Sequence, residues 1–216
     1  MIDHEDLPDT MLVRQLNEKL EALNFDDEGM QFTGLTLHPA PDGRFSIFNL
    51  SWESCGAYCN PWNELLVRFE NGDKRDYTNW EDVAEWQMLA IDSILLLDKD
   101  SSLYLIMGNS WGRPRGIEGV YSVDFCMVKL DDNYLDLRWG HSATDSNMAH
   151  DEENESEPGA EMIFHHADSS ISYRSAGYQE SDPWTYTRES GRFKFDSQTR
   201  TFVETEYMER WWINKN

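Results

Sequence analysis

Residues 65–78 have the sequence LLVRFENGDKRDYT, and this stretch decides the fold. An apolar run comes first, the dipeptide Asn71-Gly72 follows, and a shorter run ending in Tyr-Thr comes after it. Asn-Gly is a favoured two-residue connection between antiparallel strands, because both residues accept the positive φ angles that such turns need. The stretch therefore predicts a β-hairpin with strands at Leu65–Phe69 and Asp76–Thr78.

Runs of the same kind lie on both sides of this hairpin. From residue 30 onwards, β-branched and aromatic residues alternate with polar ones, and turn residues such as Pro41-Asp42-Gly43 separate the runs. The other predicted strands are Gln31–Leu37, Arg44–Trp52, Leu89–Leu97, Leu103–Met107, Val120–Leu130, Tyr134–Trp139, Met162–His166, Ile171–Arg174, Phe193–Phe195 and Thr201–Tyr207. A period of two is typical of half-buried strands, so the chain is predicted to be mainly β, with an antiparallel sheet or sandwich.

Two helices are predicted beside these strands, which makes the fold class mainly β (α+β). Leucines recur at spacings of three and four over Asp9–Asn24, and this pattern predicts an N-terminal amphipathic helix. Thr78 and Glu81 have the spacing of a capping box, which predicts one short internal helix over Asn79–Gln87. A chain of 216 residues can fold around one core, so residues 1–216 are predicted to form a single domain.

A segment near residues 142–160 differs from the rest of the chain in its charge. No Lys or Arg occurs between Arg138 and Arg174, while carboxylates accumulate beside Ser, Asn, Pro and Gly. Such a composition offers few apolar anchors and concentrates like charges. We therefore predict a mobile acidic loop within the domain.

The charge of the whole chain limits the classes of partner. Forty-one Asp and Glu against 18 Lys and Arg give a formal net charge of -23. This excess repels nucleic-acid backbones and anionic membranes and favours a basic protein as partner. We expect a cytoplasmic protein, because the first residues do not form a secretory signal and the three cysteines do not suggest a disulfide framework.

The segment Asn109-Ser110-Trp111-Gly112 resembles the one that orients the catalytic His in papain-like cysteine proteases, and the region of Cys55 faintly resembles their nucleophile segment. The resemblance implies a thiol protease. That chemistry needs a His between the Cys and the Asn to deprotonate the thiol, and no His occurs between His38 and His141. We therefore predict no covalent chemistry here and no catalytic residue.

Metal and cofactor motifs are also missing from the sequence. Cys55 and Cys59 form a C-x3-C pair rather than the two-residue spacing of a zinc knuckle. His165 and His166 are adjacent, so in a strand they would point to opposite faces. The chain has no glycine-rich phosphate loop or dinucleotide fingerprint, and we expect neither a metal nor a cofactor.

Charge, size and the missing catalytic motifs together favour an acidic protein-interaction module. By analogy, it would be an immunity or inhibitor protein that neutralises a basic partner such as a toxin or enzyme. Two alternatives stay open: a Trp-rich domain that binds a carbohydrate or small ligand, and an enzyme with a dispersed carboxylate or His site. Loops often carry binding surfaces. The predicted partner-binding residues are Trp111, Arg113, Arg115, Asp151, Glu152, Glu153 and Glu155.

Overall fold

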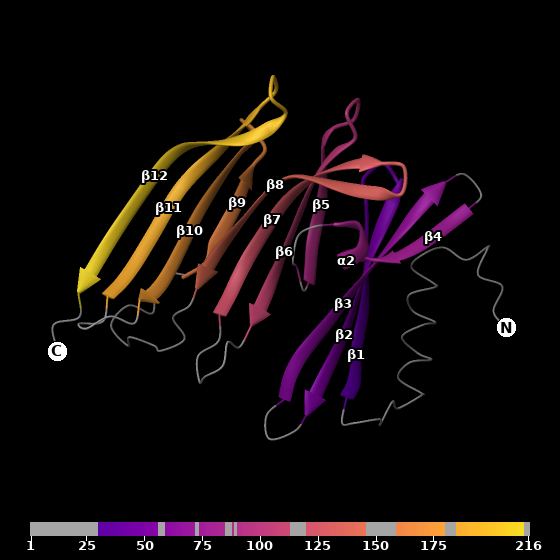
Figure 1. The fold of residues 1–216 in the computed structure, drawn as a ribbon, viewed down its shortest axis with the longest axis horizontal. Coiled ribbons are helices and arrows are strands. Elements are labelled where there is room, and N and C mark those ends of the chain that lie inside the picture. The colour runs from indigo at the N-terminus through magenta and orange to yellow at the C-terminus, as the bar shows by residue number, and fades with distance from the viewer. Residues whose placement is uncertain are drawn as a thin grey trace. The chain divides into compact units, whose positions relative to one another are not determined.

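The computed structural model describes residues 30–55, 59–71, 74–84, 88, 90–112, 120–145, 159–179 and 185–213. These residues form twelve strands and one short helical turn, so the prediction of a mainly β chain is confirmed (Figure 1). The predicted helix over Asp9–Asn24 lies outside the described residues.

The first sheet is a four-stranded antiparallel meander in which the strands follow chain order. Its strands are β1 (Met30–Pro39), β2 (Phe45–Cys55), β3 (Cys59–Asn71) and β4 (Lys74–Asn79). The predicted hairpin is confirmed, because β3 and β4 pair antiparallel, but Asn71 is a strand residue opposite Lys74 and not part of the connection as predicted. Residues 72–73, which join the two strands, lie outside the described residues.

The second sheet has eight strands. They are β5 (Ala90–Asp98), β6 (Leu103–Gly112), β7 (Val120–Asp131), β8 (Tyr134–Asp145), β9 (Glu161–His165), β10 (Ser170–Gln179), β11 (Thr185–Asp196) and β12 (Thr201–Ile213). The strand order is β12-β11-β10-β8-β7-β6-β5, and β9 pairs with β10 as well. The sheet is mixed rather than purely antiparallel, because β8 and β10 meet as parallel strands at Asp145 and Ala176.

Every predicted strand is present, but several extend beyond their predicted ends. β11 begins at Thr185, well before Phe193, because its polar first half is held between β10 and β12. β8 continues to Asp145, so residues 142–145 belong to a strand. Residues 146–158, the centre of the predicted acidic loop, lie outside the described residues, and the mobile loop stays a prediction.

The chain divides into two compact units. The first comprises Met1–Ile106 and Lys129–Asp136, and the second comprises Met107–Val128 and Leu137–Asn216. Strands β6, β7 and β8 therefore contribute residues to both units. Whether residues 1–216 fold as a single domain, as the sequence predicts, stays a prediction.

The core of the first unit lies on both sides of β2. Phe45 and Ile47 are fully buried opposite Phe69 and Val67 of β3 on one face. On the other face, Phe48 and Leu35 form a buried cluster that Leu37, Leu50 and Leu66 complete. A strand in this position is buried on both faces, which explains why β2 has apolar residues on both of its sides.

The internal helix is only one turn long. α2 (Trp80–Val83) ends where Ala84 becomes extended, and the Ala84 amide donates to the carbonyl of Trp80 at 2.9 Å. Asn79 precedes this turn without a side-chain capping bond, so the predicted helix over Asn79–Gln87 is not confirmed. Residues 85–87 lie outside the described residues. No helix in the described ranges is long and apolar enough to cross a membrane.

Candidate partner-binding site

The hairpin of β11 and β12 distributes its side chains over two faces with one irregularity. The strands pair antiparallel, with a register shift between Arg192 and Phe193. Arg192 lies opposite Glu206 and Phe193 opposite Glu204, so Thr205 is the extra residue of a β-bulge. The bulge reverses the alternation, and residues beyond it lie on the opposite face from the one that strict alternation would give.

One face of this hairpin carries three carboxylates around an exposed tyrosine. We call it the acidic face and define it as Glu189, Glu204, Tyr207 and Glu209. Glu189 lies directly opposite Glu209, and directly paired residues share a face. The side chain of Tyr207 is 55% exposed. Like charges directly opposite each other are unfavourable, so a cation bound here would relieve the repulsion.

The three carboxylates of the acidic face act on one phenol. Desolvation and the neighbouring Glu189, Glu209 and Glu204 raise the pKa of Tyr207. The hydroxyl therefore stays protonated at neutral pH and remains a hydrogen-bond donor and acceptor. Because all three charges act on the same group, they form one region of negative potential rather than three isolated charges.

An aromatic layer supports the acidic face from the neighbouring strand. The Tyr173 hydroxyl donates to Glu204 Oε1 at 2.7 Å, and its ring stacks on Phe193 with centroids 5.1 Å apart. Burial and the bond to Glu204 raise the pKa of Tyr173, so this phenol also stays protonated. The carboxylate of Glu204 is thereby fixed in position by a buried residue of β10.

Gly191 provides the space for this arrangement. A Cβ atom at Gly191 would lie 2.5 Å from the carbonyl oxygen of Glu206 and 2.5 Å from Cε1 of Tyr173. Only glycine lets the Tyr173 ring cross β11 and reach Glu204. Glycine is required at this position because the Tyr173 ring passes close to the backbone of β11.

His141 lies inside the aromatic layer, with its ring centroid 4.4 Å from Tyr173 and 4.7 Å from Phe193. Its Nε2 atom is buried and has no hydrogen-bond partner among the described residues. Desolvation lowers the pKa of His141, and the charge of Glu204 opposes this effect only in part. The folded protein therefore holds the imidazole in its neutral form.

This burial predicts a pH dependence of stability. The unfolded chain protonates His141 near its ordinary pKa of 6.5, above the folded value. The contribution of the neutral, buried His141 to the free energy of unfolding is thus fully present above about pH 6.5. It is lost as the pH falls from there through the lower folded pKa. We expect the free energy of unfolding to fall less steeply in His141→Phe than in the wild type between about pH 7.5 and about pH 5.5. The exposed His166→Phe should keep the wild-type slope, and equal slopes for all three proteins would contradict the prediction.

The opposite face of the same hairpin carries arginines. We call it the arginine face and define it as Arg188, Arg192 and Arg210. Arg188 lies opposite Arg210, whereas Arg192 lies opposite Glu206. A groove of about 740 Å³ lies against this hairpin. Its lining residues are Glu161, Ser172, Tyr173, Arg174, Ser190, Gly191, Thr205, Glu206, Tyr207 and Met208.

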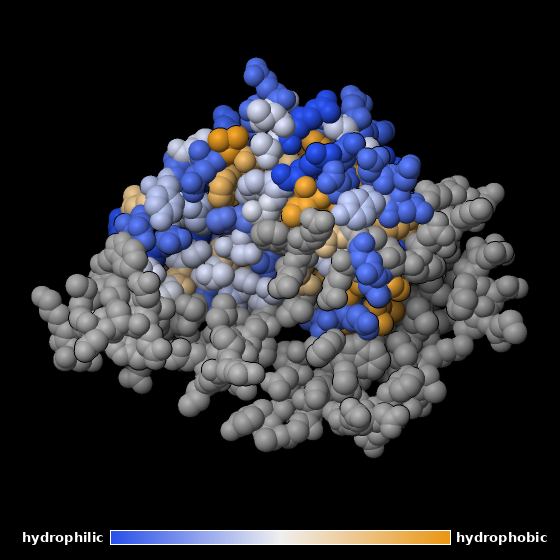
Figure 2. Space-filling model, viewed as in Figure 1, coloured by the Kyte–Doolittle hydropathy of each residue, from blue (hydrophilic) through white to orange (hydrophobic). Residues whose placement is uncertain are grey.

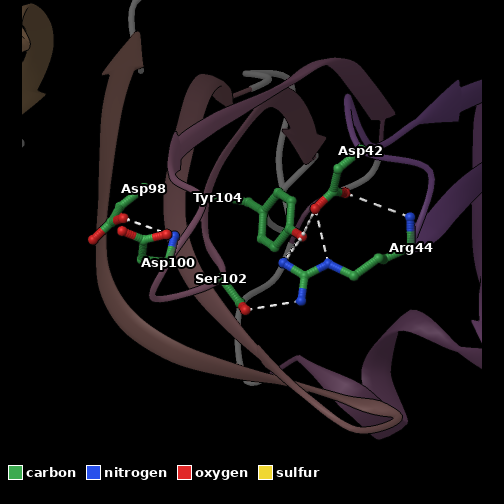
Figure 3. Close-up of polar contacts among 6 residues, drawn as sticks. All are labelled: Asp42, Arg44, Asp98, Asp100, Ser102 and Tyr104. Carbon is green, nitrogen blue, oxygen red and sulfur yellow. Dashed lines mark hydrogen bonds and ion pairs between the residues drawn. The ribbon is translucent and has the colours of Figure 1, made fainter.

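A second polar cluster, in the first unit, ties a turn to a strand (Figure 3). Arg44 donates from Nε to Asp42 at 2.8 Å and from Nη1 to Ser102 at 2.8 Å. Tyr104 donates to Asp42 Oδ2 at 2.7 Å. Desolvation acts to raise the pKa of Asp42, but the hydrogen bonds from Tyr104 and Arg44 outweigh it and lower that pKa. These groups satisfy one another, so we assign the cluster a structural role.

A third cluster, in the second unit, surrounds a buried carboxylate. Asp124 is 2% exposed and accepts hydrogen bonds from Ser110 at 2.7 Å, Ser122 at 3.3 Å and Ser142 at 2.5 Å. The serines come from three neighbouring strands, β6, β7 and β8. Three hydroxyl donors replace the water that a buried carboxylate loses. This cluster stabilises the sheet, and Ser110 of the Asn-Ser-Trp-Gly segment belongs to it.

The structure tests none of the predicted partner-binding residues. Trp111 lies in β6, but its side chain is outside the described residues, as are Arg113 and Arg115. The acidic-loop residues Asp151, Glu152, Glu153 and Glu155 are also outside. The acidic face is not among the predicted sites. Glu204 lies in a predicted strand and Glu209 just beyond its predicted end, but no signal in the sequence pairs these two residues with Glu189.

The ladder of β2 and β3 places Cys55 directly opposite Cys59. Paired residues in antiparallel strands have Cα atoms about 4.5 to 5.5 Å apart, within the range that a disulfide requires. Among the described cysteines, Cys126 is a buried free thiol, and burial beside Asp124 raises its pKa. Within the described part of the chain, no group of three or more His, Cys, Asp or Glu is placed to hold a metal ion.

No protein-family model matches the chain, and neither a curated protein nor a solved structure is significantly similar to it. Its function must therefore be inferred from its own surface. Among the coloured residues in Figure 2, hydrophilic ones predominate and hydrophobic ones occur in small groups. Such a surface favours recognition by charge with a few apolar contacts.

Proposed function

We propose that the protein is an acidic interaction module that binds a basic protein, as an immunity or inhibitor protein binds a toxin or enzyme. The observation that carries this proposal is the acidic face, where Glu189, Glu204 and Glu209 surround the exposed Tyr207. Carboxylates attract Lys and Arg of a partner, and a tyrosine ring offers a flat surface for a guanidinium group.

Two features support the binding of a basic partner. Tyr173 of β10 holds Glu204 by a hydrogen bond, so this carboxylate is ordered before a partner arrives. The formal net charge of -23 adds a long-range attraction that raises the association rate with a basic partner at low salt. The segment around Trp111 and the loop residues Asp151, Glu152, Glu153 and Glu155 remain proposed contacts for the same basic partner.

The test uses an oligo-arginine peptide as a defined basic probe. We expect the triple variant Glu189→Gln, Glu204→Gln, Glu209→Gln to bind it about tenfold more weakly. Each exposed ion pair contributes about 0.5 kcal/mol, and three of them amount to about one factor of ten. Binding is measured by titration calorimetry at about 0.01 M and about 0.15 M salt, where the Debye length falls from roughly 30 Å to roughly 8 Å.

A matched control separates the acidic face from net charge. The variant Asp100→Asn, Asp131→Asn, Asp132→Asn removes the same number of charges from exposed positions in the first unit, in or next to turns. We expect it to bind the probe nearly as well as the wild type. Equal weakening by both variants would show attraction without a site, and no binding by the wild type at low salt would refute the proposal.

A further inference from the structure

β12 forms one edge of the eight-stranded sheet, and β11 is its partner among the described strands (Figure 1). Eight successive residues, 203–210, are exposed, including Val203 at 45% and Met208 at 51%. Consecutive exposed residues mean that both faces of β12 are open here. No described strand pairs with β12 on the side away from β11, so among the described residues the main-chain donors and acceptors of that edge have no strand partner.

An open edge of this kind can take up an extended segment of another chain as an additional strand. Natural proteins restrict such edges with charges and bulges, and β12 has both, with the bulge at Thr205 and three glutamates. The glutamates of β12 disfavour the addition of an acidic strand but favour the addition of a basic one.

The two faces of β12 differ in charge, and this difference specifies the added strand. Glu204 and Glu209 give the acidic face of β12 two negative charges, whereas Glu206 and Arg210 on the arginine face offset each other. Successive side chains of an added strand point to opposite faces of the sheet. Lys or Arg at every second position would therefore meet the acidic face, and small or acidic residues would suit the positions between them.

We propose that β12 is the docking edge for an extended segment of the basic partner, which joins the sheet with its basic residues at alternate positions on the acidic face. This inference rests on the proposed function, because it names the way in which the basic partner is held. A second copy of the chain is the less favourable occupant, because each copy carries a formal net charge of -23.

The test compares four peptides against the intact protein. The first alternates Arg and Thr over eight residues, so that all its arginines share one face of a strand. The second has the same composition in two blocks, four Arg then four Thr. The third is the alternating peptide with N-methyl groups on the amides of every second residue, and a fourth, methylated at the other residues, covers the alternative registration. Affinity is measured by calorimetry and the protection of β12 amides by hydrogen exchange.

We expect the alternating peptide to bind about tenfold more tightly than the block peptide and to protect amides within residues 203–210. One of the two methylated peptides should lose this advantage, because its blocked amides are those that would pair with β12. The triple variant of the acidic face should reduce binding of the alternating peptide most.

Equal affinities for all the peptides, without protection of β12, would overturn strand addition. The proposed function would survive that result if binding still required the acidic face, and it would fail separately if oligo-arginine did not bind at all. Light scattering of the protein alone provides the last comparison. A dimer that protects the same β12 amides would make a second copy the occupant and refute the basic segment.

Discussion

Replacing Asp124 with Ala is expected to destabilise the protein by about 3 kcal/mol. The carboxylate is 2% exposed and accepts hydrogen bonds from Ser110, Ser122 and Ser142. Its removal leaves three hydroxyl donors without their acceptor, and a buried donor in that position costs about 1 to 3 kcal/mol. The loss stays near the lower end of the sum, because Ser110 and Ser142 are only half-buried and Ser110 and Ser122 can then hydrogen-bond to each other. Urea unfolding at neutral pH measures the difference.

Two further variants define what Asp124 contributes. Asp124→Asn keeps the shape and one acceptor oxygen, so we expect an intermediate loss, because the amide nitrogen cannot accept from the serines. Asp100→Ala removes an exposed carboxylate and should change stability by less than about 0.5 kcal/mol. A loss below about 1 kcal/mol for Asp124→Ala would show that the serines find other partners or water.

The strands were predictable because their signal is local. Alternating β-branched and aromatic residues located all twelve strands, and the turns at Lys99 and Ser197 lie between consecutive predicted strands. The amide of Gln198, for example, donates to Asp196 at 2.8 Å, as expected of an Asp that begins a turn. Strand ends were less predictable, because β11 starts in a polar segment held by its neighbours.

The acidic face was not predictable from the same alternation. Strict alternation over residues 204–209 groups Glu204 with Glu206 and separates both from Tyr207. The bulge at Thr205 instead places Glu204 and Tyr207 on one face, with Glu206 on the other. The position of a bulge depends on how two strands pair, and no residue type in β12 indicates it from the sequence. The face is completed by Glu189 from another strand, and the sequence does not contain the register of that pair.

The cluster around Asp124 shows the same limit. Its serines lie on β6, β7 and β8, and their positions in the chain follow no motif. The Asn-Ser-Trp-Gly segment resembles a segment of papain-like proteases, although we predicted no covalent chemistry for it. In the structure, Ser110 of that segment donates a hydrogen bond to the buried carboxylate of Asp124. The spacing of residues along the chain predicts a polar cluster only when one helix, strand or loop carries all its side chains. Here the side chains come from three strands.

Replacing Gly191 with Ala is expected to destabilise the protein by about 2 to 3 kcal/mol and to weaken the acidic face at the same time. The new methyl group would lie 2.5 Å from the carbonyl oxygen of Glu206, which belongs to the backbone of β12 and cannot rotate away. It would also lie 2.5 Å from Cε1 of Tyr173, so that ring must leave its place over β11. The stacking on Phe193 and the hydrogen bond to Glu204 are then lost together.

Gly34→Ala is the matched control, because no atom lies within 4 Å of its new Cβ position in β1. We expect its free energy of unfolding to stay within about 0.5 kcal/mol of the wild type. Tyr173→Phe separates the two effects of Gly191→Ala, since it removes the bond to Glu204 while keeping the ring. If ordering of Glu204 contributes to binding, Tyr173→Phe weakens oligo-arginine binding with little loss of stability. Unchanged binding in both Tyr173→Phe and Gly191→Ala would show that the acidic face needs no support from the aromatic layer.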